Sequence, residues 1–226
     1  MGQGRTAANV SEGEAQAGAP AVPARDGART LRAIEAAARS IIEAVGEDPT
    51  RDGLVETPAR VARAFAEMTS GYGADLHGIL GTVFEAPAGA PAGDLVVVEG
   101  IPFHALCEHH LLPFSGVATV GYVPSGRIVG LSKIPRLVDA LARRLQVQER
   151  LTAEIVDALE GALAPQGVGA MVSAEHLCLA ARGARQPGVL MTTEALRGSL
   201  RGDAALRAAL ARAHDRGLAR RGADRG

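Results

Sequence analysis

Two cysteines and the histidines beside them are the residues of this sequence best suited to chemistry. Cys107 and His110 form a Cys-x-x-His pair, and His176 and Cys178 form a His-x-Cys pair much later in the chain. Thiolate sulfur and imidazole nitrogen are donors that zinc takes in tetrahedral protein sites. His109 is adjacent to His110, so we do not expect both to bind the same ion. The spacing predicts a metal site formed by Cys107, His110 and Cys178.

The fourth position of this site distinguishes a catalytic centre from a structural one. His176 and Cys178 are two residues apart in a predicted strand, so we expect their side chains on one face of it. Three protein ligands and an open position are typical of a catalytic zinc that activates water. A closed structural site, with His176 or His109 as fourth ligand, is the alternative that spacing leaves open. A disulfide is not expected, because each cysteine lies beside histidine and cytoplasmic thiols stay reduced.

A second group of residues has the chemistry to hold an anion and a base. Ser132, Lys133 and Arg136 open a predicted helix, whose free N–H groups and partial positive charge suit a phosphate. Gln148 and Glu149 stand at a predicted break between two helices, where a carboxylate can accept hydrogen bonds from adjacent N–H groups of a base. The alternatives are ordinary: solvated charge at the first helix, and a favourable N-terminal carboxylate at the second.

Two arginines extend this group. Arg182 follows shortly after Cys178, where it can reach another phosphate. Arg60 lies on an early predicted helix, and a solvated helical arginine is the simpler interpretation of it on local grounds.

The first part of the chain is predicted to be helical. Residues 1–27 are rich in Ala, Gly, Pro and charge without periodicity, which predicts a disordered tail. Apolar residues recur at helical spacing from Leu31 to Val45, and a second helix is predicted to begin at Thr57-Pro58, with Thr57 as its N-cap. Residues 28–93 form this helical region, which ends in a predicted loop at 86–93.

Residues 94–213 are predicted to form the catalytic domain. Strands are expected at 95–98, 114–123, 127–131, 168–178 and 189–193, because these runs are rich in β-branched residues. A helix is predicted from Ser132 and a second one to 163, because the apolar stripe loses phase near 146–149. A helix near 203–213 precedes a frayed tail at 214–226. The fold class is therefore α+β.

Composition and charge exclude little but point to an ordinary globular protein. Apolar residues make up 47% of the chain, charged residues 22%, and the formal net charge is −1. Such a balance does not indicate a nucleic-acid or membrane surface partner. No apolar run approaches the roughly 18 residues of a membrane span, and no signal peptide is recognisable. We expect a cytoplasmic protein.

Several blocks of the sequence together resemble GTP cyclohydrolase I, from about residue 28 to about residue 213. The densest blocks are CEHHLLPFSG (107–116), GLSKIPRLV (130–138), RRLQVQERLT (143–152) and AEHLCLAARG (174–183), and EDPTRDGLVETPARVA (47–62) fits as well. Their number and order make the resemblance specific. His104 departs from the pattern, since Ser is usual there, but the ligand positions are intact.

The resemblance implies a reaction, a fold and an assembly. GTP and water would give 7,8-dihydroneopterin triphosphate and formate, the first step toward tetrahydrofolate, with one Zn²⁺ per subunit. The fold would be the tunnelling fold, a ββααββ unit with an antiparallel sheet. Subunits of the family pair their sheets into five-membered rings, and two rings stack into a homodecamer with sites between subunits.

The resemblance also implies roles by position. The metal ligands would be Cys107, His110 and Cys178. Proton transfer would involve His109 and His176, with Ser132 assisting. Glu149 would anchor guanine with Gln148 beside it, and the triphosphate would contact Ser132, Lys133, Arg136 and Arg182. Arg60 would reach a neighbouring subunit's site.

Two other interpretations remain at this point. One is a zinc-stabilised module that senses GTP without converting it. The other keeps the fold and changes the chemistry to pterins or deazapurines, although the joint presence of CEHH, His-x-Cys and QVQE argues against that.

Overall fold

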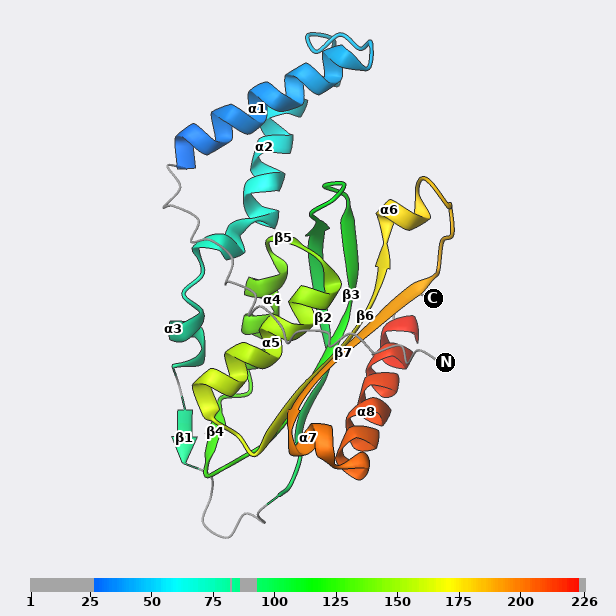
Figure 1. Cartoon of the computed structure of the whole chain (residues 1–226). Coiled ribbons are helices and arrows are strands. Elements are labelled where there is room, and N and C mark those ends of the chain that lie inside the picture. Colours follow the sequence, from blue (N-terminus) through cyan, green and yellow to red (C-terminus); the bar gives the residue numbers. More distant parts are fainter. Residues whose placement is uncertain (1–26, 82, 86–92, 224–226) are drawn as a thin grey trace, which may run out of the picture.

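The computed structural model describes residues 27–81, 83–85 and 93–223. Helices α1 (Gly27–Ala44) and α2 (Thr57–Met68) pack against each other at one end of the molecule, beyond the end of the sheet (Figure 1). Helix α2 begins one residue from the predicted cap: Glu56 is the N-cap and Thr57 is already helical, its hydroxyl donating to the Gly53 carbonyl. The tail predicted at 1–27 lies outside the described residues except for Gly27, which starts α1.

The segment between α2 and the main sheet is only partly helical. It contains the 3-10 turn η1 (Ser70–Gly73), helix α3 (Leu76–Leu80) and strand β1 (Val83–Glu85). Gly71 donates its N–H to the Arg143 carbonyl, and a Cβ built there would meet the Ala140 carbonyl oxygen at 1.9 Å. Glycine therefore lets η1 lie directly on the end of helix α4 (Lys133–Ala142). Most of the predicted loop at 86–93 lies outside the described residues.

A five-stranded sheet forms the centre of the fold, in the order β5-β2-β3-β6-β7. Its members are β2 (Val96–Cys107), β3 (Pro113–Val123), β5 (Leu145–Gln146), β6 (Gly167–His176) and β7 (Leu190–Gly198). The four long strands are antiparallel, and only β5 runs parallel to its neighbour β2. The prediction of an antiparallel sheet holds for these four strands.

Two of the predicted strands in the first half of this domain differ from the observed ones. The first, expected at 95–98, continues to Cys107, because a bulge between Val98 and Ile101 interrupts the alternation and the pairing with β3 then resumes. The strand expected at 127–131 is β4 (Arg127–Val129), which leaves the main sheet and pairs with β1.

Helices α4 (Lys133–Ala142) and α5 (Gln148–Leu163) cover one face of the sheet and enclose the core (Figure 1). They are separate helices, as the loss of phase predicted. Buried side chains such as Phe103, Phe114, Leu141 and Ile155 belong to this core. Apart from the short elements β4, β5 and α6, the chain runs β2-β3-α4-α5-β6-β7, so the predicted ββααββ order of the long elements is confirmed.

Strand β6 ends at His176, two residues earlier than predicted. Its pairing with β3 ends at His176 opposite Phe114, and its pairing with β7 ends at Glu175. Without a partner on either side, the chain turns into the short helix α6 (Leu177–Ala180), which carries Cys178. The expectation that His176 and Cys178 share one face of a strand is therefore wrong.

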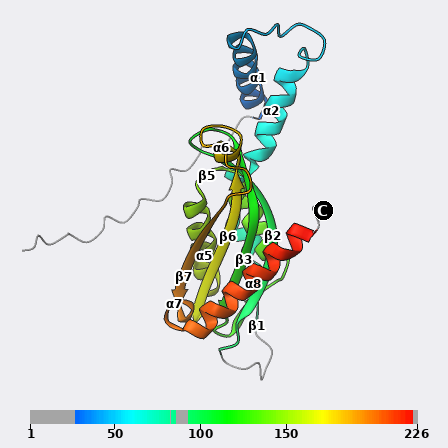
Figure 2. The same cartoon turned by 90° about the vertical axis from the view of Figure 1, so that its right-hand side faces the viewer.

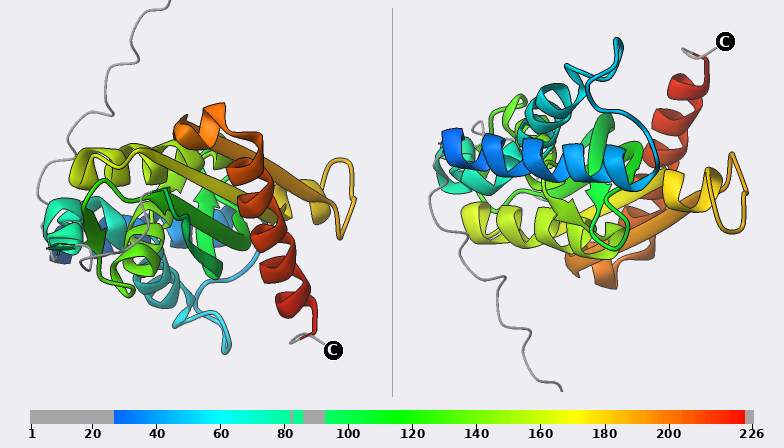
Figure 3. Two further views of the ribbon diagram at one scale, coloured as in Figure 1. Left: turned by 90° about the horizontal axis from the view of Figure 1, so that it is seen from below. Right: turned by 90° about the horizontal axis from the view of Figure 1, so that it is seen from above.

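The other face of the sheet is covered by α8 (Ala204–Ala223), which follows the short helix α7 (Ser199–Gly202) (Figures 2 and 3). The frayed tail predicted from residue 214 is wrong as far as Ala223. His214 is buried on the sheet, and Gly217 lies so close to Gly100 that a Cβ on it would be 2.8 Å from the Gly100 nitrogen. This packing extends the helix beyond what its composition indicates. Among the described helices, none is long and apolar enough to cross a membrane.

Candidate metal centre and active site

Cys107, His110 and Cys178 converge at one end of the sheet. Cys107 is the last residue of β2, His110 lies in the turn that follows, and Cys178 comes from α6. One donor atom from each lies within 4.8 Å of the others, and Cys107 Sγ is 3.7 Å from His110 Nδ1. A tetrahedral ion with bonds of about 2.3 Å needs donors roughly 3.8 Å apart, so this set fits a zinc-type cation with small adjustments.

A tight turn holds the first two ligands together. The Cys107 N–H donates to the Leu112 carbonyl at 2.9 Å, and the Leu111 N–H donates to the Cys107 carbonyl at 2.8 Å. Leu111 adopts a φ of 55°, the left-handed conformation that costs a non-glycine residue roughly 1–2 kcal/mol. The turn therefore accepts backbone strain to place His110 beside the Cys107 sulfur.

The Cys178 thiol depends on a cation for its charge. Burial, and then the neighbouring Cys107, raise the pKa of the Cys178 thiol, while Arg182 acts in the opposite direction. A divalent cation reverses this balance, because a coordinating thiol is deprotonated. The donor set thus matches a metal ion better than a pair of free thiols.

His109 and His176 are not part of the ligand group. Among the described residues, the only group of three or more clustered metal-binding side chains is Cys107, His110 and Cys178. His109 is exposed and lies edge-on to His110, with ring centroids 6.3 Å apart. In the part of the chain that the structure describes, the clustered donors therefore come from three residues, and neither His109 nor His176 is among them.

His176 is held by Gln148 and Phe114. The His176 ring stacks on Phe114 with centroids 4.5 Å apart, and its Nε2 lies 2.9 Å from Gln148 Oε1. The Gln148 amide nitrogen donates to the Val172 and Met191 carbonyls at 2.9 and 2.8 Å. Carbonyl oxygens only accept, so the amide orientation is assigned and its oxygen faces the histidine. His176 Nε2 therefore carries hydrogen, and Nδ1 is the nitrogen that can accept a proton.

Burial affects the charge of His176 as well. Desolvation lowers its pKa, and the carboxylate of Glu149 opposes this. Gln148 itself is buried, with its amide bonded inside the chain. Gln148 is therefore placed to orient the ring of His176.

The remaining predicted residues lie apart from the metal ligands. Ser132, Lys133 and Arg136 stand at the start of α4, and the Ser132 hydroxyl does not cap the helix. Ten helical residues span about 15 Å, and it is the far end of α4 that leads to β5 and the metal ligands. Arg136 lines a cavity of about 520 Å³ with Arg143 and neighbouring residues.

Glu149, Arg182 and Arg60 are all exposed. Glu149 lines a second cavity, of about 440 Å³, together with Thr193, Glu194, Arg197, Arg201 and Arg207. Neither this cavity nor the one beside Arg136 has a metal ligand in its lining. Arg182 follows α6, and Arg60 projects from α2. One chain thus assembles the ligands, the two histidines and Gln148. Glu149 and Arg182 are close enough to act on the pKa values of His176 and Cys178, whereas Arg60 and the basic residues at the start of α4 lie elsewhere.

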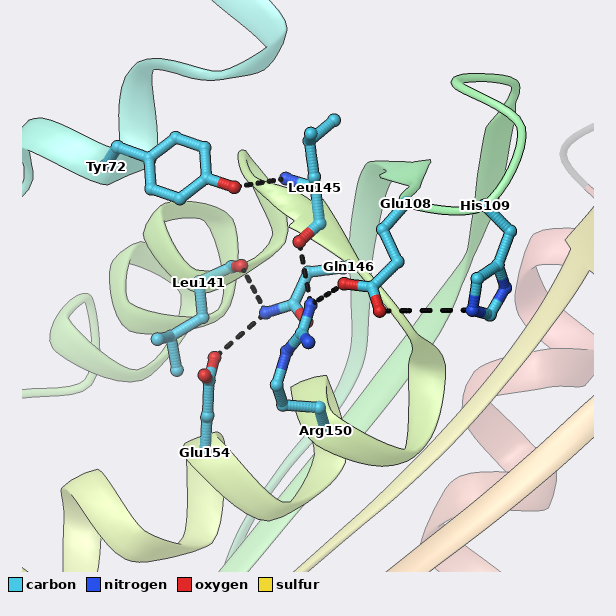
Figure 4. A network of polar contacts seen from close by, with 8 residues as sticks. All are labelled: Tyr72, Glu108, His109, Leu141, Leu145, Gln146, Arg150 and Glu154. Atoms are coloured by element: carbon cyan, nitrogen blue, oxygen red, sulfur yellow. Dashed lines mark hydrogen bonds and ion pairs between the residues drawn. The ribbon is translucent and has the colours of Figure 1, made fainter. Parts of the chain in front are cut away.

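Sequence reasoning missed two residues of this region. Phe114 supports the ring of His176, and Glu108 links the metal-binding turn to α5 through Arg150 (Figure 4). Both residues belong to the block at 107–116, so their closeness in sequence to Cys107 and His110 was the one indication that they would lie near the site. Nothing in the spacing indicated which of their neighbours they would contact.

The fold and the site together define an α+β class of protein with a Cys₂His cluster, suited to a metal ion, at one end of a largely antiparallel sheet. The sequence model of the GTP cyclohydrolase I family matches residues 34–215. The chain therefore belongs to the GTP cyclohydrolase I family of hydrolases, and its ββααββ unit is the tunnelling fold.

Bacterial relatives agree over most of the chain. GTP cyclohydrolase 1 of Mycobacteroides abscessus is 54% identical over 176 residues, which are 77% of this chain and 84% of that protein. GTP cyclohydrolase 1 of Thermobifida fusca is 55% identical over 170 residues, or 74% and 80% of the two chains. GTP cyclohydrolase 1 of Mycobacterium ulcerans is 51% identical over 191 residues, or 81% and 93%.

Proposed function

We propose that this chain is a zinc-dependent GTP cyclohydrolase I, which converts GTP and water to 7,8-dihydroneopterin triphosphate and formate on the route to tetrahydrofolate. The observation that carries this proposal is the three-donor cluster of Cys107, His110 and Cys178 beside the oriented His176. In a purely structural metal site, the fixed orientation of His176 would have no chemical role. We infer a cytoplasmic location, where reduced thiols stay available to a metal.

The metal ligands and the two histidines have different roles: the ligands would hold the metal that activates water, and the histidines would transfer protons. When bound by these three donors, Zn²⁺ lowers the pKa of a water molecule toward neutrality, which supplies the hydrolytic power for opening the guanine ring at C8. His109, exposed beside the ligands, is placed to give a proton to the imidazole nitrogen N7. His176 accepts and returns a proton at Nδ1 during ribose opening, and Ser132 assists it from another part of the site.

Glu149 and the basic residues position the substrate. The Glu149 carboxylate, at the start of α5 next to Gln148, is suited to accept the guanine N1–H and amino hydrogens. Lys133, Arg136 and Arg182 hold the triphosphate, so that non-reacting contacts orient the base over the metal.

The dispersal of the basic residues supports a site shared between subunits. The start of α4 is at the opposite end of this helix from β5, which pairs with Cys107, and Arg60 projects from α2. We infer a homodecamer of two stacked pentamers, in which Lys133, Arg136 and Arg60 complete the site of a neighbour. Light scattering during size-exclusion chromatography tests this, and a monomer with full turnover would contradict it.

A GTP turnover assay tests the reaction. Purified protein is incubated with GTP, and formate and the fluorescence of oxidised neopterin are measured with and without a chelator. We expect equimolar formate and neopterin, lost on chelation and restored by Zn²⁺. GTP binding without either product would instead identify a sensor, and a product from another purine would identify a different cyclohydrolase-like chemistry.

A further inference from the structure

Arg150 connects the start of α5 to the turn that carries the metal ligands (Figure 4). Its Nη2 atom donates to Glu108 Oε2 at 2.5 Å and to the Leu145 carbonyl at 2.8 Å. Its Nε atom donates to Gln146 Oε1 at 3.0 Å. The guanidinium therefore has three fixed partners, and the planar fork of arginine rather than a point charge is what satisfies them together.

The β5 side of this connection is rigid. Gln146 is buried, and its amide nitrogen donates to the Leu141 carbonyl at 3.0 Å and to Glu154 Oε2 at 2.9 Å. The Leu145 N–H donates to the Tyr72 hydroxyl at 3.2 Å. Residues from η1, α4, β5 and α5 thus hold the groups that Arg150 contacts.

The other side of the connection is the metal-binding turn. Glu108 lies between the ligand Cys107 and His109, and its N–H donates to the Gln146 carbonyl at 3.0 Å. Its second carboxylate oxygen, Oε1, lies 3.9 Å from His109 Nε2. Glu108 therefore binds β5 through its backbone and α5 through its side chain, and it faces the exposed histidine with its remaining oxygen.

This arrangement differs from an ordinary surface ion pair. Exposed pairs contribute little, since both side chains must be ordered and water screens their charges. Here both side chains are about two-thirds covered, with 37% exposed for Arg150 and 33% for Glu108, and the pair belongs to a continuous hydrogen-bonded network. Networks of this kind restrict the geometry of the groups at their ends.

We propose that Glu108 and Arg150 are positioning residues, which together set the metal-binding turn and His109 at a fixed place relative to the first turn of α5. That turn carries Glu149, so the pair couples the place where the base is held to the place where water is activated. The inference rests on the proposed metal-dependent function, but its first consequence is independent of turnover: without the pair, the strained turn at 107–112 presents Cys107 and His110 less favourably to a metal.

Cobalt(II) titration of the metal-free protein tests this directly, because thiolate ligation gives an absorption band that reports binding. We expect Glu108→Gln and Arg150→Met each to weaken Co²⁺ binding by about tenfold, the lower end of the effect of removing outer contacts of a metal site. The double variant should also lose about tenfold rather than about a hundredfold, because both changes remove one shared contact. The Co²⁺ affinity of Arg150→Lys should lie between those of the parent and of Arg150→Met, since lysine keeps the positive charge and loses the planar array of donors.

A matched control separates this role from general destabilisation. Arg143→Met removes a similarly covered arginine that pairs with Asp139 on α4, and it should leave Co²⁺ affinity within about twofold of the parent. Each variant's folding is checked by circular dichroism before titration. Folded single variants with parental Co²⁺ affinity, or additive losses in the double variant, would overturn the proposal.

Steady-state kinetics with GTP gives a second readout. At saturating Zn²⁺, the single variants should lose kcat by about tenfold or more with a smaller change in KM, because His109 is misplaced while Glu149 remains. Unchanged kcat in the fully metallated variants would contradict a role in placing His109. If the parent protein does not turn over GTP at all, the proposed function fails, whereas the Co²⁺ titration still decides whether the pair positions the metal-binding turn.

Discussion

The Oε1 atom of Gln148 lies 2.9 Å from Nε2 of His176, and this contact determines which nitrogen of the histidine can accept a proton. The glutamine cannot turn its amide around, because its nitrogen already donates to two backbone carbonyls, those of Val172 and Met191. A residue from α5 thereby controls the tautomer of a residue at the end of β6. The pair can be tested separately from the metal ligands.

Replacing Gln148 should lower turnover more than substrate binding. In Gln148→Leu, the His176 ring loses its hydrogen-bond acceptor. We expect kcat to fall by about 10- to 100-fold, less than the roughly 10²- to 10⁴-fold contribution of a whole general acid or base, because the ring remains and only its orientation is lost. Bound metal should stay stoichiometric, because no ligand is changed.

The control for this variant is Thr152→Val. Thr152 donates to the Gln148 carbonyl and contacts Thr193 in the same buried network, but it does not touch His176. Both variants should lose about 1–3 kcal/mol of unfolding free energy from unpaired polar groups. Equal losses of kcat in both would show that stability, not orientation of the histidine, explains the effect.

His109→Ala should separate binding from chemistry. His109 is exposed and is not part of the ligand group, so the variant should keep its metal and bind GTP with near-parental affinity. Formate release should fall by about 10²- to 10⁴-fold, the typical contribution of a positioned general acid. The measurements are elemental analysis, equilibrium binding of GTP and formate detection. Near-normal turnover would remove His109 from the mechanism.

Cys178→Ser should lose the bound metal. Cys178 is the ligand contributed by α6, and a serine hydroxyl is a poor substitute for a thiolate at zinc. Elemental analysis of the purified variant should find far less than one ion per chain, and GTP turnover should disappear with it. Stoichiometric zinc in this variant would show that another residue is the third ligand.

His214 should make stability fall on the acid side of neutrality. Burial lowers its pKa below the ordinary 6.5, with the carboxylate of Asp215 acting in the opposite direction, and its ring contacts the Ser173 and Thr119 hydroxyls. As the pH falls through about 6.5, His214 becomes protonated in the unfolded chain while it stays neutral in the folded chain. Stability is therefore full above this pH and declines as the pH falls from 6.5 toward the lowered pKa, by at most about 1.4 kcal/mol per pH unit.

His214→Gln removes this titration while keeping a donor and an acceptor for the two hydroxyls. Urea unfolding at pH values from 8 to 5 should show a flatter dependence in the variant than in the parent. Parallel curves for the two proteins would mean that other groups cause the acid-side decline.

Gly116→Ala should separate β3 from β6. A Cβ at Gly116 would lie 1.9 Å from the Ser173 carbonyl oxygen and 2.7 Å from the Ala174 Cα, and backbone atoms cannot move aside without breaking the ladder. We expect a loss of about 3 kcal/mol or more, at the upper end of overpacking effects. Gly161→Ala is the control: it lies within α5 with open space around it, and alanine there should stabilise by about 1 kcal/mol. Equal stability of the two variants in urea would contradict this account of the sheet.

Local patterns predicted a large part of the fold, because they report burial one element at a time. The helical stripe that loses phase near Gln146 correctly separated α4 from α5, and the order ββααββ followed from it. The pattern failed where a long-range partner decides the outcome. Residues 214–223 are rich in arginine and have little amphipathic character, and it is their packing on Gly100 and Glu99 that keeps them helical.

The sequence by itself predicted Cys107, His110 and Cys178 as a metal-ligand set from residue type and spacing, and the structure brings these three side chains together. Only the tertiary structure decided that Cys178 comes from a helix, that Gln148 orients His176, and that Arg150 reaches Glu108. The physical reason is that donor chemistry belongs to single side chains. Which hydrogen-bond partner a side chain meets depends on how α5, β2 and β6 pack, and residues far apart in the chain set that packing together.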